Sequence, residues 1–185
     1  MYFSVFLIIC YVVKKERKQF WQILKSNQFF WKQTIMAILL HIILRLILVS
    51  FSIDPIAKNT YGLIEEFKTS KIKFLAGACI TAPFLEEFVF RYLIFEVFGK
   101  GKNNMLGFLL SSLISLVTFT FHHYQGENNI IELTVFICQY LAATLWFIYL
   151  YRKSQWTLAI PILFHSLTNL FVFINLLVKP DFIVL

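Results

Sequence analysis

Two glutamates and an arginine, Glu86, Glu87 and Arg91, lie within an apolar stretch long enough to cross a membrane. A charged side chain at the bilayer centre costs roughly 2.5 to 3.5 kcal/mol in insertion measurements, so such residues mark candidate functional sites. On a helix, Glu87 and Arg91 at i and i+4 share one face, whereas Glu86 points about 100° away. We expect Arg91 to pair with Glu87 and to leave Glu86 free as a general base or acid. The structural alternative is an ion pair that only joins two helices.

Histidines lie in two later apolar segments. His122 and His123 end the first, and His165 precedes Asn169 by four residues in the second. Adjacent helical residues face different directions, so only one of His122 and His123 is expected to point inward. Alone, His165 and Asn169 fit hydrogen bonding between helices. With the charged trio, they supply what hydrolysis needs in a membrane: a base for water, oxyanion donors and a polar pocket.

Several other hydrolytic sites are excluded by missing motifs. The sequence has no H-E-x-x-H and no G-x-S-x-G, which excludes a zincin-like helix and a serine nucleophile elbow. Its two aspartates, Asp54 and Asp181, lie at the edges of apolar segments and cannot form an intramembrane dyad. The three cysteines are unrelated in spacing and form neither a disulfide framework nor a zinc motif. A glutamate and histidine pair acting on water remains.

The elements that must position these residues are membrane helices. The chain has 185 residues, of which 59% are hydrophobic and only 15% charged, against about 25% in soluble domains. This composition predicts one all-α domain over 1–185, a polytopic transmembrane bundle of about five to six spans with a motif-bearing core at 73–178. The predicted spans are 2–13, 34–53, 73–98, 105–124, 130–151 and 157–178, and the first is too short to cross unaided.

The charge of the loops predicts the orientation of the bundle. Lys and Arg are concentrated in 14–33, which places this loop in the cytoplasm and alternates the later loops accordingly. The net charge is +7, but the basic residues are spread between apolar segments and form no single stripe. Orientation of the chain in the membrane therefore explains them better than nucleic-acid binding does. The segment 54–72 is expected to form a short surface helix. The apolar stretch at 2–13 precedes its charges, an order opposite to that of a cleaved signal peptide.

Three spaced motifs resemble those of one family. Glu86-Glu87-x-x-x-Arg91, Phe119-x-x-x-His123 and His165-x-x-x-Asn169 lie in order on three apolar segments. This pattern is similar to that of the CPBP intramembrane proteases (Abi, type II CAAX prenyl protease-like). The matched region runs from Thr81 to Asn175, about half of the chain.

The resemblance implies a catalytic cavity in a helical bundle. Glu86 and His123 would activate the water, His165 and Asn169 would stabilise the oxyanion, and Glu87 with Arg91 would shape the site. In the family motif a phenylalanine precedes the histidine by four residues, and Phe119 in that position selects His123 over His122. A zinc ion on His123, His165 and Glu86 is chemically reasonable, and a metal-free glutamate mechanism is equally arguable.

The expected function is that of an intramembrane endopeptidase in a bacterial plasma membrane, with a peptide or membrane-protein substrate. Peptide processing or self-immunity against a bacteriocin is what the resemblance suggests. One alternative is a non-proteolytic immunity protein that binds a toxin or receptor. Another is a proton-coupled carrier, against which the lack of an internal repeat counts.

The depths of the site residues conflict if every helix is upright. Glu86 lies near the middle of its span and His123 near the outer end of its own. Helix tilt, or an irregular segment after Gly99, must bring them together.

Overall fold

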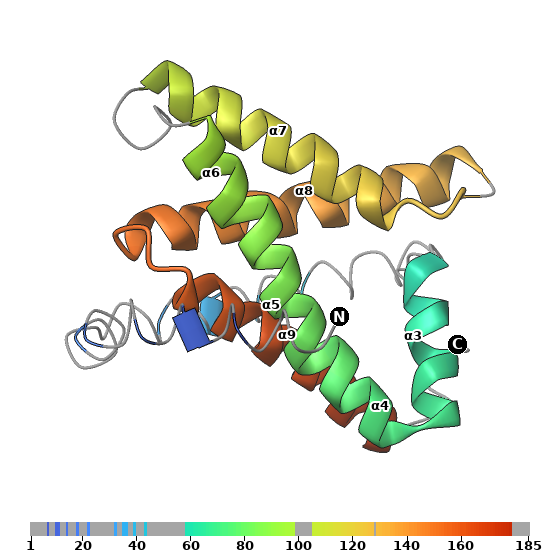
Figure 1. The fold of residues 1–185 in the computed structure, drawn as a ribbon. Helices are drawn as coiled ribbons and strands as arrows, with labels where there is room; N and C mark the ends of the chain where they lie inside the picture. Colours follow the sequence, from blue (N-terminus) through green and yellow to red (C-terminus); the bar gives the residue numbers. More distant parts are fainter. Residues whose placement is uncertain are drawn as a thin grey trace.

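The computed structural model describes residues 58–98, 105–127 and 129–178, with isolated helical residues between 7 and 43. The predicted spans at 2–13 and 34–53 lie outside the described residues, apart from these isolated positions. The described chain is helical and contains no strand, as predicted for an all-α protein (Figure 1). Its elements are α3 (Lys58–Thr69), α4 (Lys71–Ala76), η1 (Gly77–Thr81), α5 (Ala82–Glu87), η2 (Phe88–Leu93), α6 (Ile94–Val97), α7 (Met105–His123), α8 (Ile130–Lys153) and α9 (Ala159–Val178).

Three of the described helices are long and apolar enough to cross a membrane. These are α7, α8 and α9. Their bounds agree with the predicted spans at 105–124, 130–151 and 157–178 to within about two residues. Asn129 caps α8, because its side-chain oxygen accepts the amides of Ile131 and Glu132 at 3.0 and 2.9 Å.

The predicted span at 73–98 is one continuous rod with two irregular turns. From α4 to α6 every junction residue has right-handed helical backbone angles, so the chain runs unbroken through η1 and η2 (Figure 1). Both irregular turns are π-helical, with backbone bonds that reach five residues back instead of four. Such π-bulges are rare and occur frequently at functional sites. The Glu86–Glu87 pair lies between them.

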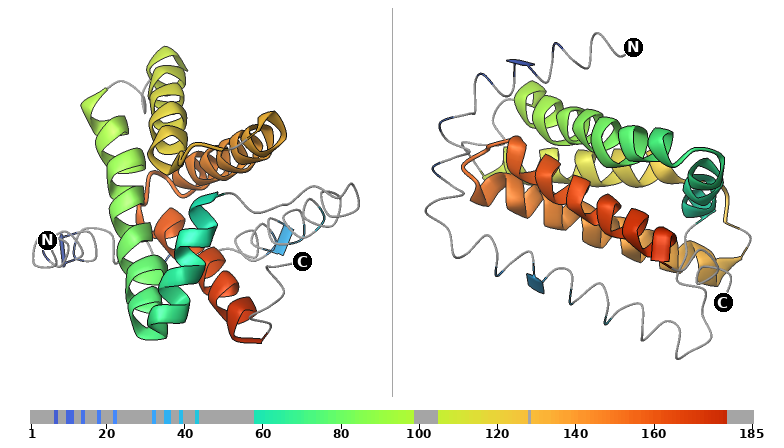
Figure 2. Two further views of the ribbon diagram at one scale, coloured as in Figure 1. Left: turned by 90° about the vertical axis from the view of Figure 1, so that its right-hand side faces the viewer. Right: turned by 90° about the horizontal axis from the view of Figure 1, so that it is seen from below.

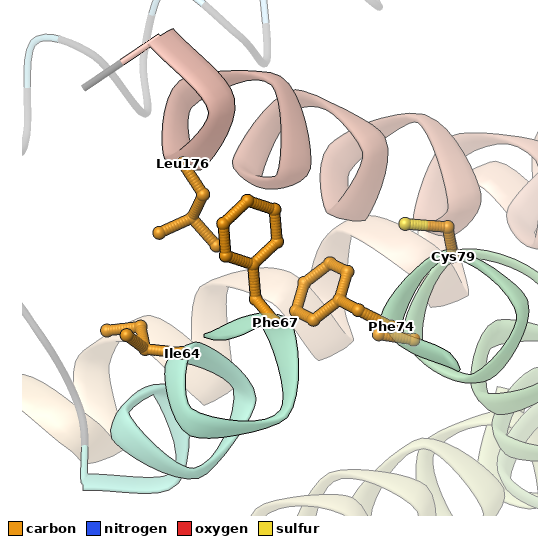
Figure 3. Close-up of a cluster of buried hydrophobic side chains, with 6 residues drawn as sticks. Ile64, Phe67, Phe74, Cys79 and Leu176 are labelled. Atoms are coloured by element: carbon orange, nitrogen blue, oxygen red, sulfur yellow. The ribbon is translucent and has the colours of Figure 1, made fainter. Parts of the chain in front are cut away.

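The short helix α3 packs against the start of this rod and the end of α9. Its Ile64 and Phe67 join Phe74, Cys79 and Leu176 in a buried cluster (Figure 3). Ser70 follows the last residue of α3 and is the N-cap of α4, because its hydroxyl oxygen accepts the amide hydrogen of Lys73 over 3.3 Å. The surface helix expected within 54–72 is therefore present, with one apolar face covered.

Helix α7 meets the rod through a stripe of small residues. Its buried positions are spaced by four: Gly107, Ser111, Ser115 and Phe119. Small side chains at this spacing let helices approach closely in a membrane. The rod crosses in front of α8 obliquely in Figure 1, and the views in Figure 2 show α7, α8 and α9 on one side of the rod. Inclination of the helices thus brings Glu86 beside the end of α7.

A tight turn returns the chain from α8 to α9. Gln155 and Trp156 both have left-handed backbone angles, with φ of 55° and 63°. The Ser154 hydroxyl lies 3.1 Å from the carbonyl oxygens of both Tyr151 and Thr157, which closes the turn. The turn lays α9 along α8, so that His165 stacks on Phe147 with ring centroids 4.8 Å apart.

Candidate active site

The Glu86 carboxylate is approached by imidazoles from two other helices. Its Oε2 atom lies 3.5 Å from Nε2 of His123 on α7 and 3.8 Å from Nε2 of His165 on α9. All three side chains retain slight exposure, between 10% and 15%. Residues 86, 123 and 165 thus converge although they belong to separate helices.

Glu87 anchors the other side of His165. Its Oε1 lies 2.9 Å from Nδ1 of His165, and its Oε2 lies 3.1 Å from Nε of Arg91. Both Glu87 and Arg91 have no exposed surface. The ion pair predicted from the i and i+4 spacing is therefore present, and it is coupled to an imidazole of the site. A buried carboxylate with two such partners is held in one orientation.

Aromatic rings enclose Arg91. Its guanidinium carbon lies 4.3 Å from the ring centre of Phe119 and 5.0 Å from that of Phe147. A cation over aromatic faces is stabilised by their quadrupoles, and more strongly so away from water. The same two rings contact the histidines, since Phe119 lies 4.5 Å from His123 and Phe147 lies 4.8 Å from His165 between ring centres.

The hydrogen bonds of the two imidazoles determine which nitrogen faces Glu86. Nδ1 of His123 lies 2.9 Å from the carbonyl oxygen of Phe119, which can only accept. Nδ1 of His165 faces the Glu87 carboxylate, also an acceptor. Both Nδ1 atoms must therefore carry hydrogen, and in the neutral tautomers both Nε2 atoms present lone pairs. Three acceptors then surround one point, an arrangement that suits a water molecule or a cation.

A third imidazole lies at the edge of the site. Ligand atoms of Glu86, His122 and His123 all lie within 4.8 Å of one another, a group of the kind that can hold a metal ion. His122 is exposed and its ring centre lies 5.5 Å from that of Phe90. The register of the motif favours His123 over His122, whereas both adjacent histidines lie near Glu86. The expected zinc ligands were Glu86, His123 and His165, whereas this group has His122 instead of His165.

Asn169 contacts the rod rather than the carboxylates. Its side-chain nitrogen donates to the carbonyl oxygen of Ala78 over 2.7 Å. Ala78 belongs to η1, eight residues before Glu86. Asn169 is thus one turn along α9 from His165, and its described hydrogen bond points to the backbone of the first π segment.

Helix α8 contributes two aromatic rings to the site that were not predicted from the sequence. Tyr140 stacks on His123 with ring centres 4.7 Å apart and an angle of 29° between planes. Phe147 stacks on His165 at an angle of 19°. No motif marks these residues, because aromatic side chains are abundant throughout the chain. Their spacing of seven residues on one helical face was the available signal.

Comparisons with known proteins identify the family. The model for "Type II CAAX prenyl endopeptidase Rce1-like" matches residues 68–171. The "Membrane-embedded CAAX protease MroQ" of Staphylococcus aureus (strain USA300) is 31% identical over 130 residues, which are 69% of this chain and 49% of the relative. The chain therefore spans about half the length of this curated relative. No solved structure matches the chain significantly.

These matches agree with the helices described above. The chain is a multi-pass membrane protein, with three described helices that are long and apolar enough to span. The region matched by the family model contains every candidate site residue from Glu86 to Asn169. On this match, the chain belongs to the Rce1-like family of type II CAAX prenyl endopeptidases.

Proposed function

We propose that the protein is an intramembrane endopeptidase that hydrolyses a peptide bond with a water activated by Glu86 and His123. The supporting observation is the convergence of three polar atoms, Glu86 Oε2 and the Nε2 atoms of His123 and His165, from three helices. A water between them donates one hydrogen to His123 Nε2 and the other to Glu86. Its oxygen lone pair is then free to attack a carbonyl carbon.

The attack produces an oxyanion and a protonated Glu86. The water oxygen bonds to the carbonyl carbon, the carbonyl π electrons move to its oxygen, and Glu86 takes the proton. Glu86 then returns this proton to the leaving amine as the carbon–nitrogen bond breaks. In this scheme His165 takes up a proton on Nε2 from solvent before the attack, donates it as a hydrogen bond to the oxyanion and keeps it, while Nδ1–H donates to Glu87 at 2.9 Å. Asn169 offers its second amide hydrogen to the same oxygen.

Two versions of this chemistry differ in metal content. In the metal-free version, which we favour, carboxylate and imidazole hold the water directly. In the zinc version, His123 and Glu86 would hold the ion together with His165 or His122, and the ion would lower the pKa of a bound water. Tetrahedral zinc at about 2.0–2.1 Å from nitrogen requires ligand atoms roughly 3.3 Å apart. The ligands would have to close from separations of 3.5 and 3.8 Å to Glu86, or from up to 4.8 Å within the group that contains His122.

The substrate class follows from the position of the site. The reacting groups are enclosed by apolar helices, so the substrate is a peptide or membrane protein that reaches them from the bilayer. Processing of a small peptide, or self-protection against a bacteriocin, is the proposed biological role. A protein that binds a toxin without cleaving it is the competing role.

One experiment tests the proposal and its competitors. The protein is reconstituted in liposomes with quenched fluorescent peptides, among them a farnesylated CAAX peptide and its unprenylated match. Cleavage by the wild type that is lost in Glu86→Gln and His123→Ala supports the proposal. Absence of cleavage, together with protection of cells by both variants, would replace it with the binding role. Cleavage in chelator by protein free of metal on elemental analysis supports the metal-free version.

A further inference from the structure

The first π segment frees a backbone carbonyl that a side chain from another helix binds. At the end of η1 the amide of Ala82 donates to the carbonyl of Gly77, five residues earlier. In an α-helix that amide would donate to Ala78, four residues earlier. The Ala78 oxygen instead accepts the side-chain amide of Asn169 over 2.7 Å.

The second π segment repeats this arrangement with a different partner. At the end of η2 the amide of Ile94 donates to Val89, five residues earlier, and not to Phe90. The Phe90 oxygen accepts the hydroxyl of Ser115 on α7 over 2.7 Å. Both π segments that flank the Glu86–Glu87 pair therefore have the displaced carbonyl bound by a neighbouring helix. A buried carbonyl without a partner is costly, so each donor stabilises its segment in the π form.

Ser115 differs from Ser112 and Thr118, two other hydroxyl residues of α7. Ser112 and Thr118 donate to carbonyls of their own helix, at Phe108 and Ile114, over 2.7 Å each. This local bond is the usual behaviour of Ser and Thr within a helix. Ser115 is fully buried and its hydroxyl crosses to the rod instead.

The residue after Phe90 is Arg91, which pairs with Glu87, which in turn holds His165. We propose that Ser115 is a positioning residue: by binding the Phe90 carbonyl it fixes the π turn from which Arg91 and Glu87 orient His165. The inference rests on the proposed peptidase function for its kinetic consequence. A displacement of about 1 Å at a catalytic group can cost on the order of 10²-fold in rate.

The kinetic test compares Ser115→Ala with the matched control Ser112→Ala in the liposome assay. Ser115→Ala should lower kcat about tenfold and leave KM within about twofold, because it misaligns the site without touching substrate. Ser112→Ala should change neither value by more than about twofold. Ser115→Thr, which restores the hydroxyl, should recover kcat to within about threefold. If Ser115→Ala does not fold, Ser115→Cys, a weak donor, should show the same loss.

A second measurement does not depend on activity. Hydrogen exchange should be about fivefold faster in peptides covering 88–95 of Ser115→Ala, and unchanged in Ser112→Ala. An unchanged exchange rate, or wild-type kcat in Ser115→Ala, overturns the inference. A wild type that cleaves no peptide defeats the proposed function alone, because the exchange measurement still decides whether Ser115 holds the π turn.

Discussion

Glu86 and Glu87 are neighbours in the sequence, yet their surroundings differ. The Glu87 side chain has no exposed surface and is bound by Arg91 at 3.1 Å and His165 at 2.9 Å. The Glu86 side chain is 15% exposed, and its Oε2 faces imidazoles at 3.5 and 3.8 Å. The first carboxylate is fixed by close partners, whereas the second has room for a reactant. One helical step of about 100° separates a scaffold group from a reactive one.

This difference predicts that Glu86→Gln removes activity without loss of stability. Gln keeps the size of the side chain but cannot take a proton from water, so the rate of peptide cleavage should fall about 10³-fold. The free energy of unfolding should change by less than about 1 kcal/mol, because Glu86 has no tight ion pair. Initial rates and unfolding in an SDS titration measure the two quantities. A rate within tenfold of wild type would exclude Glu86 as the base.

Glu87→Gln, in contrast, should lower the free energy of unfolding strongly. It leaves the Arg91 charge buried without a counterion, which costs about 3 kcal/mol or more in proteins. The matched control is Glu65→Gln, since Glu65 pairs with Lys68 at 3.3 Å on the exposed face of α3. An exposed pair of this kind contributes little, so the control should change the unfolding free energy by about 0.5 kcal/mol or less. Equal losses in the two variants would contradict the scaffold role of Glu87.

The adjacent histidines refine the description of the reactive side. His123→Gln should lower kcat about 10²-fold, because the imidazole that accepts a hydrogen from water is lost. His122→Gln should stay within about threefold of wild type, since His122 is exposed and outside the proposed proton path. Parallel kcat measurements on the two purified variants decide between them. The reverse order of effects would assign the active role to His122.

The smallest predicted effect concerns the ring that supports His123. Tyr140→Leu removes the stacked ring 4.7 Å away and should lower kcat about three- to fivefold. Tyr140→Phe keeps the ring and should stay within about twofold of wild type. Rates of both variants at saturating peptide provide the measurement. Equal losses in the two would mean that the hydroxyl, not the ring, is what matters.

Much of the site could be expected from particular residues. The i and i+4 spacing of Glu87 and Arg91 predicted their ion pair, and the pair is present at 3.1 Å. The apolar segments predicted α7, α8 and α9 closely, because a membrane span has a fixed minimum length. The same logic could not reveal the two π segments, since hydrophobic periodicity over a few residues does not distinguish π from α turns.

The spacing of residues in the sequence could not predict the contacts between helices. Asn169 was expected at the oxyanion with His165, whereas its described hydrogen bond is to the carbonyl of Ala78. Ser115, Tyr140 and Phe147 carry no motif, and their roles appear only where α7 and α8 meet the rod. The catalytic roles and the metal content stay predictions for the experiments above.

By itself, the sequence determined that this is an all-helical membrane chain with a charged, imidazole-containing interior. Residue type and spacing are enough for that, because hydrocarbon tolerates few polar groups and requires every backbone bond to be satisfied within a helix. Only the tertiary structure decided which nitrogen faces which carboxylate, and which hydroxyl binds a displaced carbonyl. Those outcomes depend on the crossing of helices far apart in sequence, where a shift of one turn would exchange every partner.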